Sequence, residues 1–157
     1  MESSRLFCTF RLGGQLFGVD MLEVKEVTTE TDFTPIAHAP EEVLGLVNIR
    51  GHIHLVIDLR CLLGMPNANL TGNSRLVLFK SSVGNAFGVV VDEILEIHHA
   101  KAEHIEAFHL QELEPHVFQV QRVELVAAIC RLPHELLVVL NPRRFLTVVE
   151  QSLANSA

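Results

Sequence analysis

Residues 5–27 read RLFCTFRLGGQLFGVDMLEVKEV, and residues 75–97 read RLVLFKSSVGNAFGVVVDEILEI. The two stretches share one pattern, displaced by 70 positions. A second match, between residues 55–58 and residues 138–141, has a displacement of 83, so the second unit carries 13 extra residues. Ordered self-similarity of this kind indicates that the chain is built from two copies of one supersecondary unit.

Each copy is typical of a β-hairpin. Apolar and polar residues alternate in residues 5–12, a turn follows at Gly13 or Gly84, and a second β-branched and aromatic run comes after it. A period of two places successive side chains on opposite faces of a strand. Helical patterns are limited to short turns at residues 41–44, at residues 101–108 and from residue 143 onward. We therefore expect an all-β protein made of two antiparallel barrels in tandem.

The chain is expected to form a single domain over residues 1–157. We place the first barrel at about residues 5–72, the second at about residues 73–146, and a C-terminal tail at residues 147–157. The alternation of residues 53–59 predicts one strand that runs through Leu59. A chain of 157 residues is long enough to bury a core without a disulfide or a metal to stabilise it.

Composition and charge narrow the classes of partner. The chain has 12 Lys and Arg against 19 Asp and Glu, a net charge of -7, and no basic stripe that would bind phosphates. Its three cysteines are odd in number and lack CxxC spacing, which is typical of a reducing compartment. No signal peptide is evident, and the longest apolar runs, residues 86–91 and 136–140, are too short to cross a bilayer. We expect a cytoplasmic protein that binds no nucleic acid and does not insert in a membrane.

Residues 45–51 read GLVNIRG and connect an expected helical turn to a strand. Gly51 permits a tight bend that presents Arg50 outward. A guanidinium group binds carboxylates or backbone carbonyls with a two-pronged geometry that lysine lacks. The residues alone leave two interpretations open: Arg50 binds a partner helix, or it is solvated or paired locally, with Asp58 or Glu26.

Three separated blocks occur in order along the chain. They are residues 45–51 followed by residues 53–60, residues 17–20 with Val24 and Glu26, and residues 88–92 with Ile97. Together they resemble the CheW family of chemotaxis coupling proteins, over about residues 6–146. The resemblance implies two SH3-like five-stranded β-barrels with short helical turns, and a scaffold that has no cofactor and no catalytic activity. It also implies that the protein links the cytoplasmic tips of chemoreceptors to the regulatory domain of the CheA histidine kinase, in membrane-bound receptor arrays that can include other CheW-like domains.

The same resemblance implies which residues bind the receptor. The matching positions are Val24, Glu26, Arg50, Arg75 and Ile97, with Asn48, Ile49 and Gly51 forming the motif loop around Arg50. Val24 and Ile97 would flank a groove that accepts the apolar stripe of a helical hairpin. The alternative is that Val24 and Ile97 fill the barrel cores, as isolated Val and Ile residues often do.

The chain departs from the family pattern in several places. Leu55 stands where the family usually has proline, Arg75 stands where an apolar residue is common, and Glu106 replaces an arginine seen in related sequences. Residues 98–111, which follow the second repeat, are rich in histidine instead of apolar residues and proline. A reversed charge on an interaction surface can exclude one partner and select another. These departures favour a coupling protein of a more specialised chemosensory array.

Nine histidines raise a second hypothesis, a small metal-dependent enzyme or metal sensor. His52 and His54 would lie on one face of a strand, and His98 and His99 add two more imidazoles. However, no cysteine lies at ligand spacing and no HExxH pattern occurs. We therefore assign no metal ligand.

No set of catalytic residues can be assembled from the sequence. It contains no GxSxG elbow, P-loop or kinase loop. Cys61 and Cys130 lie in apolar runs, where a thiol is usually a packing group. Asp20, Asp58 and Asp92 are separated by strand-length intervals, so we interpret them as residues that end strands and begin turns.

Overall fold

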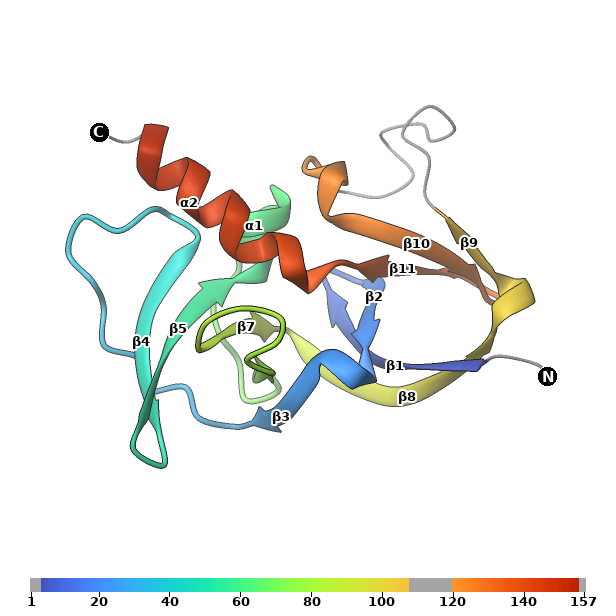
Figure 1. Cartoon of the computed structure of the whole chain (residues 1–157), viewed down its shortest axis with the longest axis horizontal. Helices are drawn as coiled ribbons and strands as arrows, with labels where there is room; N and C mark the ends of the chain where they lie inside the picture. Colours follow the sequence, from blue (N-terminus) through green and yellow to red (C-terminus); the bar gives the residue numbers. More distant parts are fainter. Residues whose placement is uncertain (1–3, 108–119, 156–157) are drawn as a thin grey trace.

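The computed structural model describes residues 4–107 and 120–155, and its strands form two sheets that lie side by side (Figure 1). Sheet A contains, in spatial order, β8 (Glu93–Lys101), β1 (Ser4–Leu12), β2 (Gln15–Asp20), β11 (Leu136–Leu140), β10 (Val126–Arg131) and β9 (Ile105–Ala107). Sheet B contains β3 (Val24–Thr28), β6 (Arg75–Phe79), β7 (Phe87–Val91), β5 (His52–Asp58) and β4 (Val43–Ile49). The prediction of a mainly β protein is confirmed.

The two sheets have the same strand order once the repeat is taken into account. β1 and β2 recur as β6 and β7, β3 recurs as β8, and β4 and β5 recur as β10 and β11. With these replacements the order of sheet B becomes the order of the first five strands of sheet A. Each sheet also has its parallel pair in the same place, between β2 and β11 in sheet A and between β7 and β5 in sheet B.

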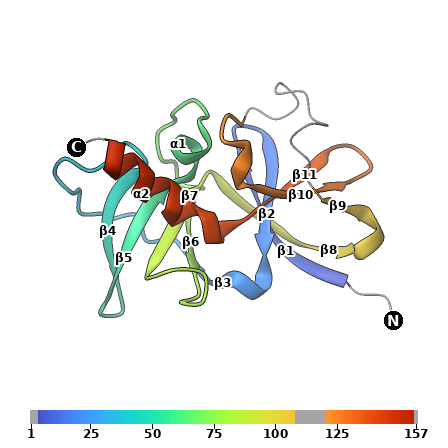
Figure 2. The same ribbon diagram turned by 45° about the horizontal axis from the view of Figure 1, so that its top comes forward.

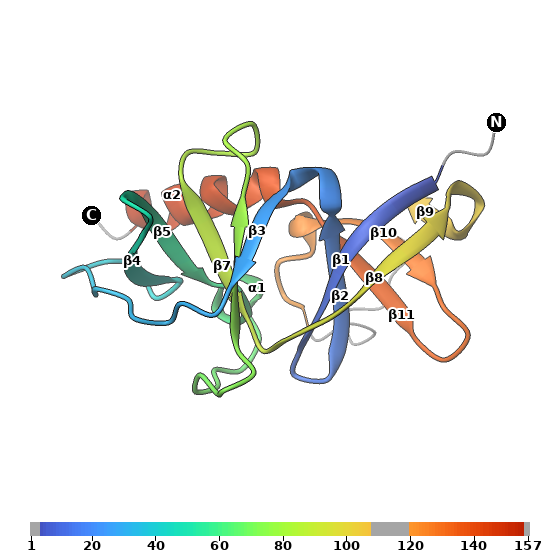
Figure 3. The same cartoon turned by 90° about the horizontal axis from the view of Figure 1, so that it is seen from below.

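Each copy of the repeat contributes strands to both sheets. The hairpin β1–β2 lies in sheet A, whereas the β3, β4 and β5 strands that follow it lie in sheet B. The second copy does the reverse, and Figure 3 shows β3 and β8 leaving the centre of the molecule in opposite directions. The sheets therefore differ from the expected division at about residues 5–72 and 73–146, because each sheet contains strands from both ranges.

Short turns at the ends of the hairpins send the chain from one sheet to the other. After β2, the 3-10 turn η1 (Met21–Glu23) is capped by Asp20, whose carboxylate accepts a hydrogen bond from the Leu22 N–H at 2.9 Å. At the equivalent place after β7, the Asp92 N–H donates to the Arg11 carbonyl at 3.2 Å. The interpretation of these two aspartates as turn residues is confirmed.

Sheet B curls until its two edges approach each other. The chain beyond β3 forms a bridge with β4 on the opposite edge, where Thr34 and Leu46 exchange two backbone hydrogen bonds of 2.8 Å. The bridge requires Gly45, because a Cβ atom there would lie 2.3 Å from the Thr34 carbonyl oxygen. A single bridge and no continuous ladder therefore joins the edges of this SH3-like barrel.

Sheet A has a sixth strand where five were expected. β8 continues through the 3-10 turn η2 (Ala102–His104) into β9, which pairs with β10 at the far edge. The short helical turn predicted for residues 101–108 is thus one 3-10 turn followed by a strand, and residue 108 lies outside the described residues. β9 corresponds to the bridge at Thr34 in sheet B, but it makes three residue pairs.

The core consists of one large cluster between the sheets and a smaller cluster inside each barrel. The large cluster includes the alternate β1 residues Cys8, Phe10 and Leu12, and Phe7 points instead into the cluster of sheet A. The predicted alternation of this strand is confirmed. Both faces of β1 are buried because one faces its own barrel and the other faces the second sheet.

Two α-helices cover the junction of the sheets. α2 (Phe145–Asn155) follows β11 and the 3-10 turns η4 (Val123–Leu125) and η5 (Pro142–Arg144) lie near its start. Figure 2 shows α2 extending from sheet A across sheet B, and Phe145 is fully buried in the large cluster. A helical segment from residue 143 onward was expected, and residues 156–157 of the predicted tail lie outside the described part of the chain. Within the described residues, no helix has the length and apolar character needed to cross a bilayer.

Two sequence-based predictions of local structure are wrong. Residues 59–63 form helix α1 (Leu59–Leu63) and do not extend the strand, because Asp58 caps the helix by accepting the Cys61 N–H at 3.4 Å. Gly64, with φ of +78°, ends the helix in the left-handed conformation that glycine favours. The helical turn predicted at residues 41–44 is wrong in its extent: residues 41 and 42 form a turn, in which the Val43 N–H donates to the Pro40 carbonyl at 3.0 Å, but β4 begins at Val43.

Candidate partner-binding site

The motif loop is a tight turn between β4 and β5. Arg50 and Gly51 have φ values of +50° and +88°, and Ile49 pairs with His52 across the turn, as in a type I′ hairpin. The Asn48 side chain accepts a hydrogen bond from the Gly51 N–H at 2.8 Å, and Ile49 is buried in the cluster inside sheet B. The turn is thus held from both sides, and it presents the Arg50 side chain at the surface.

Arg50 forms an ion pair with Glu26 of β3 through its Nη2 atom and the Glu26 Oε1 atom. β3 and β4 are the opposite edges of sheet B, so this ion pair spans the gap between them. Of the local partners that the sequence suggested, Glu26 is therefore the one that Arg50 contacts, whereas Asp58 caps α1. The Arg50 side chain remains 69% exposed, which leaves its guanidinium accessible to a partner.

Of the two interpretations of Val24, its burial agrees with the alternative of a core residue. Val24 is only 8% exposed and packs in the large cluster between the sheets. Val27, three residues further along β3, is instead exposed. The sequence contained a signal for Val27, because the repeat places it at the position equivalent to Ile97.

The other two predicted residues occupy different surroundings. Ile97, on β8 of sheet A, is 58% exposed, so the alternative that it fills a core is wrong. Arg75 begins β6, and its Nη1 atom donates to the carbonyls of Gly72 and Ser74 at 2.9 and 2.8 Å. Arg75 is therefore held by its own loop, beside the end of β3.

We call the region around β3 and β8 the β3/β8 face and define it by Glu26, Val27, Arg50 and Ile97. β3 and β8 lie on the same side of the molecule, on either side of the line where the sheets meet (Figures 1 and 3). The face combines an exposed cation and its carboxylate with two exposed aliphatic side chains. Such a combination can bind a helical partner by apolar contact and charged hydrogen bonds. The residues of the β3/β8 face do not suggest a covalent reaction.

A second ion pair, between Arg60 and Asp92, was not predicted from the sequence and connects separate segments of the chain. Arg60 of α1 donates from Nε to Asp92 Oδ1 at 2.9 Å, and the Gly13 N–H donates to Asp92 Oδ2 at 2.9 Å. Burial raises the pKa of Asp92, but the hydrogen bonds from Arg60 and Gly13 outweigh it and hold the pKa below its usual value. Asp92 therefore stays ionised and joins α1, the β1–β2 turn and the β7–β8 connection.

The histidines in the described part of the chain do not gather into a metal site. His54 is buried, with its Nδ1 atom 3.1 Å from the His52 carbonyl oxygen, and His98 Nε2 lies 3.9 Å from Cys130 Sγ. Among the residues that the structure describes, no three His, Cys, Asp or Glu side chains are placed to hold one metal ion. The hypothesis of a metal-dependent enzyme or sensor gains no support from these contacts.

The cysteines are likewise poor nucleophiles. Burial, together with nearby carboxylates such as that of Asp58, raises the pKa of Cys61 to about 11, and burial raises the pKa of Cys8 and of Cys130. A thiol with a raised pKa is mainly protonated near neutral pH and reacts slowly. This agrees with their interpretation as packing groups.

Residue Glu106, where the chain departs from the expected pattern, lies on β9. Its Oε1 atom accepts a hydrogen bond from Arg131 Nε of β10 at 3.1 Å, and both side chains are exposed. The rest of the divergent stretch, from residue 108 to residue 111, lies outside the described residues. The structure therefore places the Glu106 carboxylate on the outer edge of sheet A.

A protein-family model described as "CheW-like domain" matches residues 6–150. The chain belongs to this CheW-like family. The match extends over both sheets and over most of α2, so it covers the exchanged strands as well as the motif loop. The resemblance inferred from the three sequence blocks is confirmed.

Individual relatives agree with the family assignment. The CheW-like chain is 33% identical over 96 residues to "Chemotaxis protein CheW" of Rhizobium meliloti, a match that covers 61% of each protein. It is 26% identical over 151 residues to "Chemotaxis protein CheW" of Treponema pallidum, which covers 94% of this chain and 85% of the relative. The match thus spans only about three fifths of the length of the Rhizobium relative.

A solved structure has the same fold. The scaffolding protein TtCheW from Thermoanaerobacter tengcongensis superposes on the CheW-like chain with a TM-score of 0.75 and 25% sequence identity, covering 88% of this chain and 89% of the other. The SH3-like arrangement of the two CheW-like sheets therefore agrees with that structure. The β3/β8 face is built on this shared framework.

Proposed function

We propose that this chain is a non-enzymatic adaptor of a bacterial chemosensory system. It couples the cytoplasmic tips of chemoreceptors to the regulatory domain of a CheA-type histidine kinase. The observation that carries this proposal is the match of the CheW-like family to residues 6–150. The likeness to proteins named for chemotaxis and for scaffolding supports the same role. The adaptor would act in the cytoplasm, at membrane-bound receptor arrays that can include other CheW-like domains.

The β3/β8 face is the proposed receptor-binding surface. Glu26 holds the Arg50 guanidinium in place, and a carboxylate or helix carbonyl of the receptor can bind its remaining N–H groups. Val27 and Ile97 supply apolar contact for the stripe of a helical hairpin. Arg75 lies at the rim of this surface, and Val24 supports it from the core.

The charge pattern on the edge of sheet A supports a specialised partner. Glu106 carries a negative charge where related sequences have a positive one, and its ion pair with Arg131 is exposed. Charge reversal at a rim changes partner choice and association rate more than it changes stability. We therefore propose a kinase regulatory domain of matching charge, in an array that differs from the usual chemotaxis system.

Binding measurements with separate partners test the proposal. The purified chain is titrated with a chemoreceptor signalling-tip fragment and, separately, with a CheA-type regulatory domain, by isothermal calorimetry. We expect both to bind, and we expect Arg50→Glu to weaken receptor binding by about tenfold or more, since it replaces a charged hydrogen bond with repulsion. Kinase binding should change much less.

A matched control separates a local effect from a change in net charge. Arg144 is exposed and lies near the start of α2, away from the β3/β8 face, so Arg144→Glu changes the charge equally and should leave receptor binding intact. If the wild-type chain binds neither partner, the proposed function is wrong. If Arg144→Glu weakens receptor binding as much as Arg50→Glu does, the assignment of the face is wrong.

A further inference from the structure

The repeat places two glutamates at the same position of the two sheets. In each sheet one β-bulge interrupts the pairing of the edge strand, β3 in sheet B and β8 in sheet A. Pairs on either side of the bulge have the same spacing: Val24↔Phe79 and Val27↔Val77 in sheet B, where Glu26 also pairs with Leu78, and Ile94↔Phe10 and Ile97↔Cys8 in sheet A. Glu26 and Glu96 each immediately precede the second of these pairs, so they are structural equivalents.

The turns that face these glutamates are also equivalent, but they carry different residues. Asn48 pairs with Ile53 at the base of the β4–β5 turn, and Arg131 pairs with Leu136 at the base of the β10–β11 turn. Counting along both turns from these pairs puts Pro133 at the position of Arg50. In sheet B the Arg50–Glu26 ion pair therefore spans the gap between the edge strand and the turn, and sheet A cannot form the equivalent ion pair.

The charge of Glu96 consequently has no partner among the residues that the structure describes. Within residues 4–107 and 120–155, no side chain forms an ion pair with Glu96, which is exposed. Its backbone carbonyl accepts a hydrogen bond from Thr9 Oγ1, which fixes the bulge but does not neutralise the carboxylate. A carboxylate held at the place where the sister sheet binds an arginine is matched in charge to a basic group from outside the chain.

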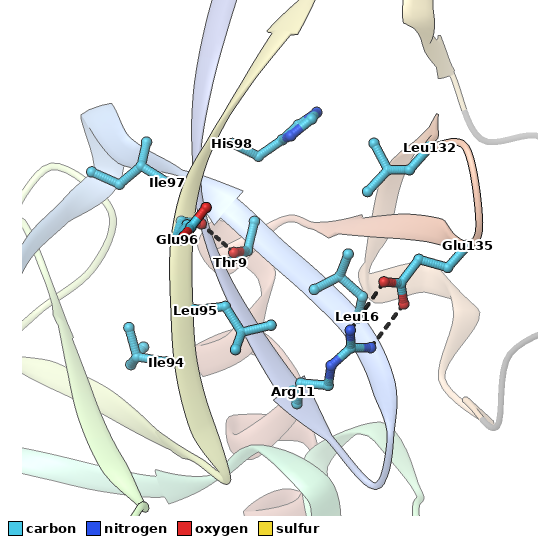
Figure 4. Close-up of a pocket in the computed structure, with 10 residues that line it drawn as sticks. All are labelled: Thr9, Arg11, Leu16, Ile94, Leu95, Glu96, Ile97, His98, Leu132 and Glu135. Carbon is cyan, nitrogen blue, oxygen red and sulfur yellow. Dashed lines mark hydrogen bonds and ion pairs between the residues drawn. The ribbon is translucent and has the colours of Figure 1, made fainter.

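The gap beside Glu96 is a groove of about 580 Å³, shown in Figure 4, which we call the β8 groove. It lies between β8 and the β10–β11 turn, with Thr9 and Leu16 at its base. The Leu95 side chain points into it, and Leu132 lines its far side. The groove therefore combines an apolar interior with a free carboxylate at its rim.

One end of the groove carries a neutralised ion pair, and one side of the groove is a free strand edge. At one end Arg11 is neutralised by Glu135, through two hydrogen bonds of 2.8 and 3.0 Å. β8 is the edge of sheet A, so the backbone of its first half has a free side next to the groove. A free strand edge is a template for an added extended segment, whose main chain pairs with it while alternate side chains fill adjacent pockets.

We propose that the β8 groove binds an extended segment of a partner protein in which an arginine lies between aliphatic residues. The arginine pairs with Glu96, in place of the Arg50 side chain that closes sheet B, and an aliphatic neighbour packs on Leu16, Leu95 and Leu132. The proposal rests on the internal comparison of the two sheets and does not require the adaptor role proposed above. It assigns a docking site distinct from the Arg50 turn.

The probe for this site is a terminally blocked heptapeptide of sequence TVRVTVT, titrated into the full-length, isotopically labelled chain and followed by NMR. We expect saturable shifts of backbone amides in residues 94–98 and at Leu132. The peptide TVQVTVT, which lacks the charge, should bind about tenfold more weakly, as expected for loss of one charged hydrogen bond.

Protein variants test the same contact from the other side. Glu96→Gln should weaken TVRVTVT binding about as much as the change in the peptide does. Pro133→Arg should weaken it as well, because it supplies an internal guanidinium for Glu96. Glu150 is exposed on α2, so Glu150→Gln makes an equal change in charge and should leave binding unaltered. The NMR spectrum of each variant also reports whether that variant is folded.

Several outcomes would overturn the proposal. These are a peptide that produces no saturable shifts, shifts that map away from β8, or equal affinity for the arginine and glutamine peptides. Receptor and kinase titrations do not enter this experiment, so a failure here leaves the proposed adaptor function unaffected. Conversely, peptide binding at β8 would stand even if neither receptor nor kinase were bound.

Discussion

Replacement of Gly45 by alanine tests whether the single bridge between Thr34 and Leu46 closes sheet B. Gly45 has a φ of +147°, a backbone conformation that residues other than glycine rarely adopt. A Cβ atom added there would meet the Thr34 carbonyl oxygen at 2.3 Å and its carbon at 2.8 Å. The neighbouring atoms belong to backbone, so the clash can be relieved only by separating the bridge.

The expected cost follows from these contacts. A non-glycine residue held in this region of backbone conformation costs about 1–3 kcal/mol. Loss of the two bridge hydrogen bonds, each of 2.8 Å, costs about 0.5–1.5 kcal/mol apiece. Gly45→Ala should therefore lower the free energy of unfolding by about 2–6 kcal/mol, a large part of the total stability of about 5–15 kcal/mol for a domain.

Urea unfolding followed by far-ultraviolet circular dichroism measures this loss, since the chain has no Trp or Tyr for fluorescence. Gly72→Ala is the matched control, because a Cβ atom there meets nothing within 4 Å, and it should change stability by less than about 0.5 kcal/mol. Hydrogen exchange at the Thr34 and Leu46 amides should also accelerate in Gly45→Ala. A loss below about 1 kcal/mol, or one equal to that of Gly72→Ala, would refute the reasoning.

Three further predictions concern other parts of the chain. Val24→Ala should lower the free energy of unfolding by about 1.5–3 kcal/mol, whereas Ile97→Ala should change it by less than about 0.5 kcal/mol, and the same urea unfolding distinguishes them. The folded-state pKa of Asp92 is lowered, so its ion pair with Arg60 contributes stability above the unfolded pKa of about 3.9. That stability is lost as the pH falls through the folded pKa, and acid titration of Asp92→Asn should show a shallower loss than the wild type. The pKa of Cys61 is raised to about 11, so its alkylation by iodoacetamide, measured by mass spectrometry, should be slow near neutral pH and accelerate up to about pH 11. Rapid labelling near neutral pH would contradict the raised pKa.

The sequence predicted the local structure of the repeat well because hairpins depend on neighbouring residues. Alternation along residues 5–12 and the glycine turn determine which side chains share a face, and the structure agrees. Which hairpin pairs with which later strand depends on contacts between distant residues. The exchange of β3 and β8 between the sheets therefore could not be read from the repeat itself.

The positions of the candidate site residues were predicted in part for a similar reason. The turn at Arg50 is encoded by Asn48 and Gly51, which are close in sequence, so its exposure could be anticipated. Val24 and Val27 are the same residue type and lie three positions apart, so a period of two places them on opposite faces of β3 without saying which face is buried. The choice between the two faces depends on the strand that β3 pairs with, and a bulge between Val24 and Glu26 shifts the register of that pairing. Such a register shift is a property of the paired strands and not of one segment.

Co-sedimentation tests the proposed coupling role most directly. Membranes that contain chemoreceptors are centrifuged with a CheA-type regulatory domain, in the presence and absence of the chain. The account predicts that the regulatory domain sediments with the membranes only when the chain is added, and that Arg50→Glu abolishes this effect. Equal sedimentation without the chain, or a chain that stays in the supernatant with both partners present, would contradict it.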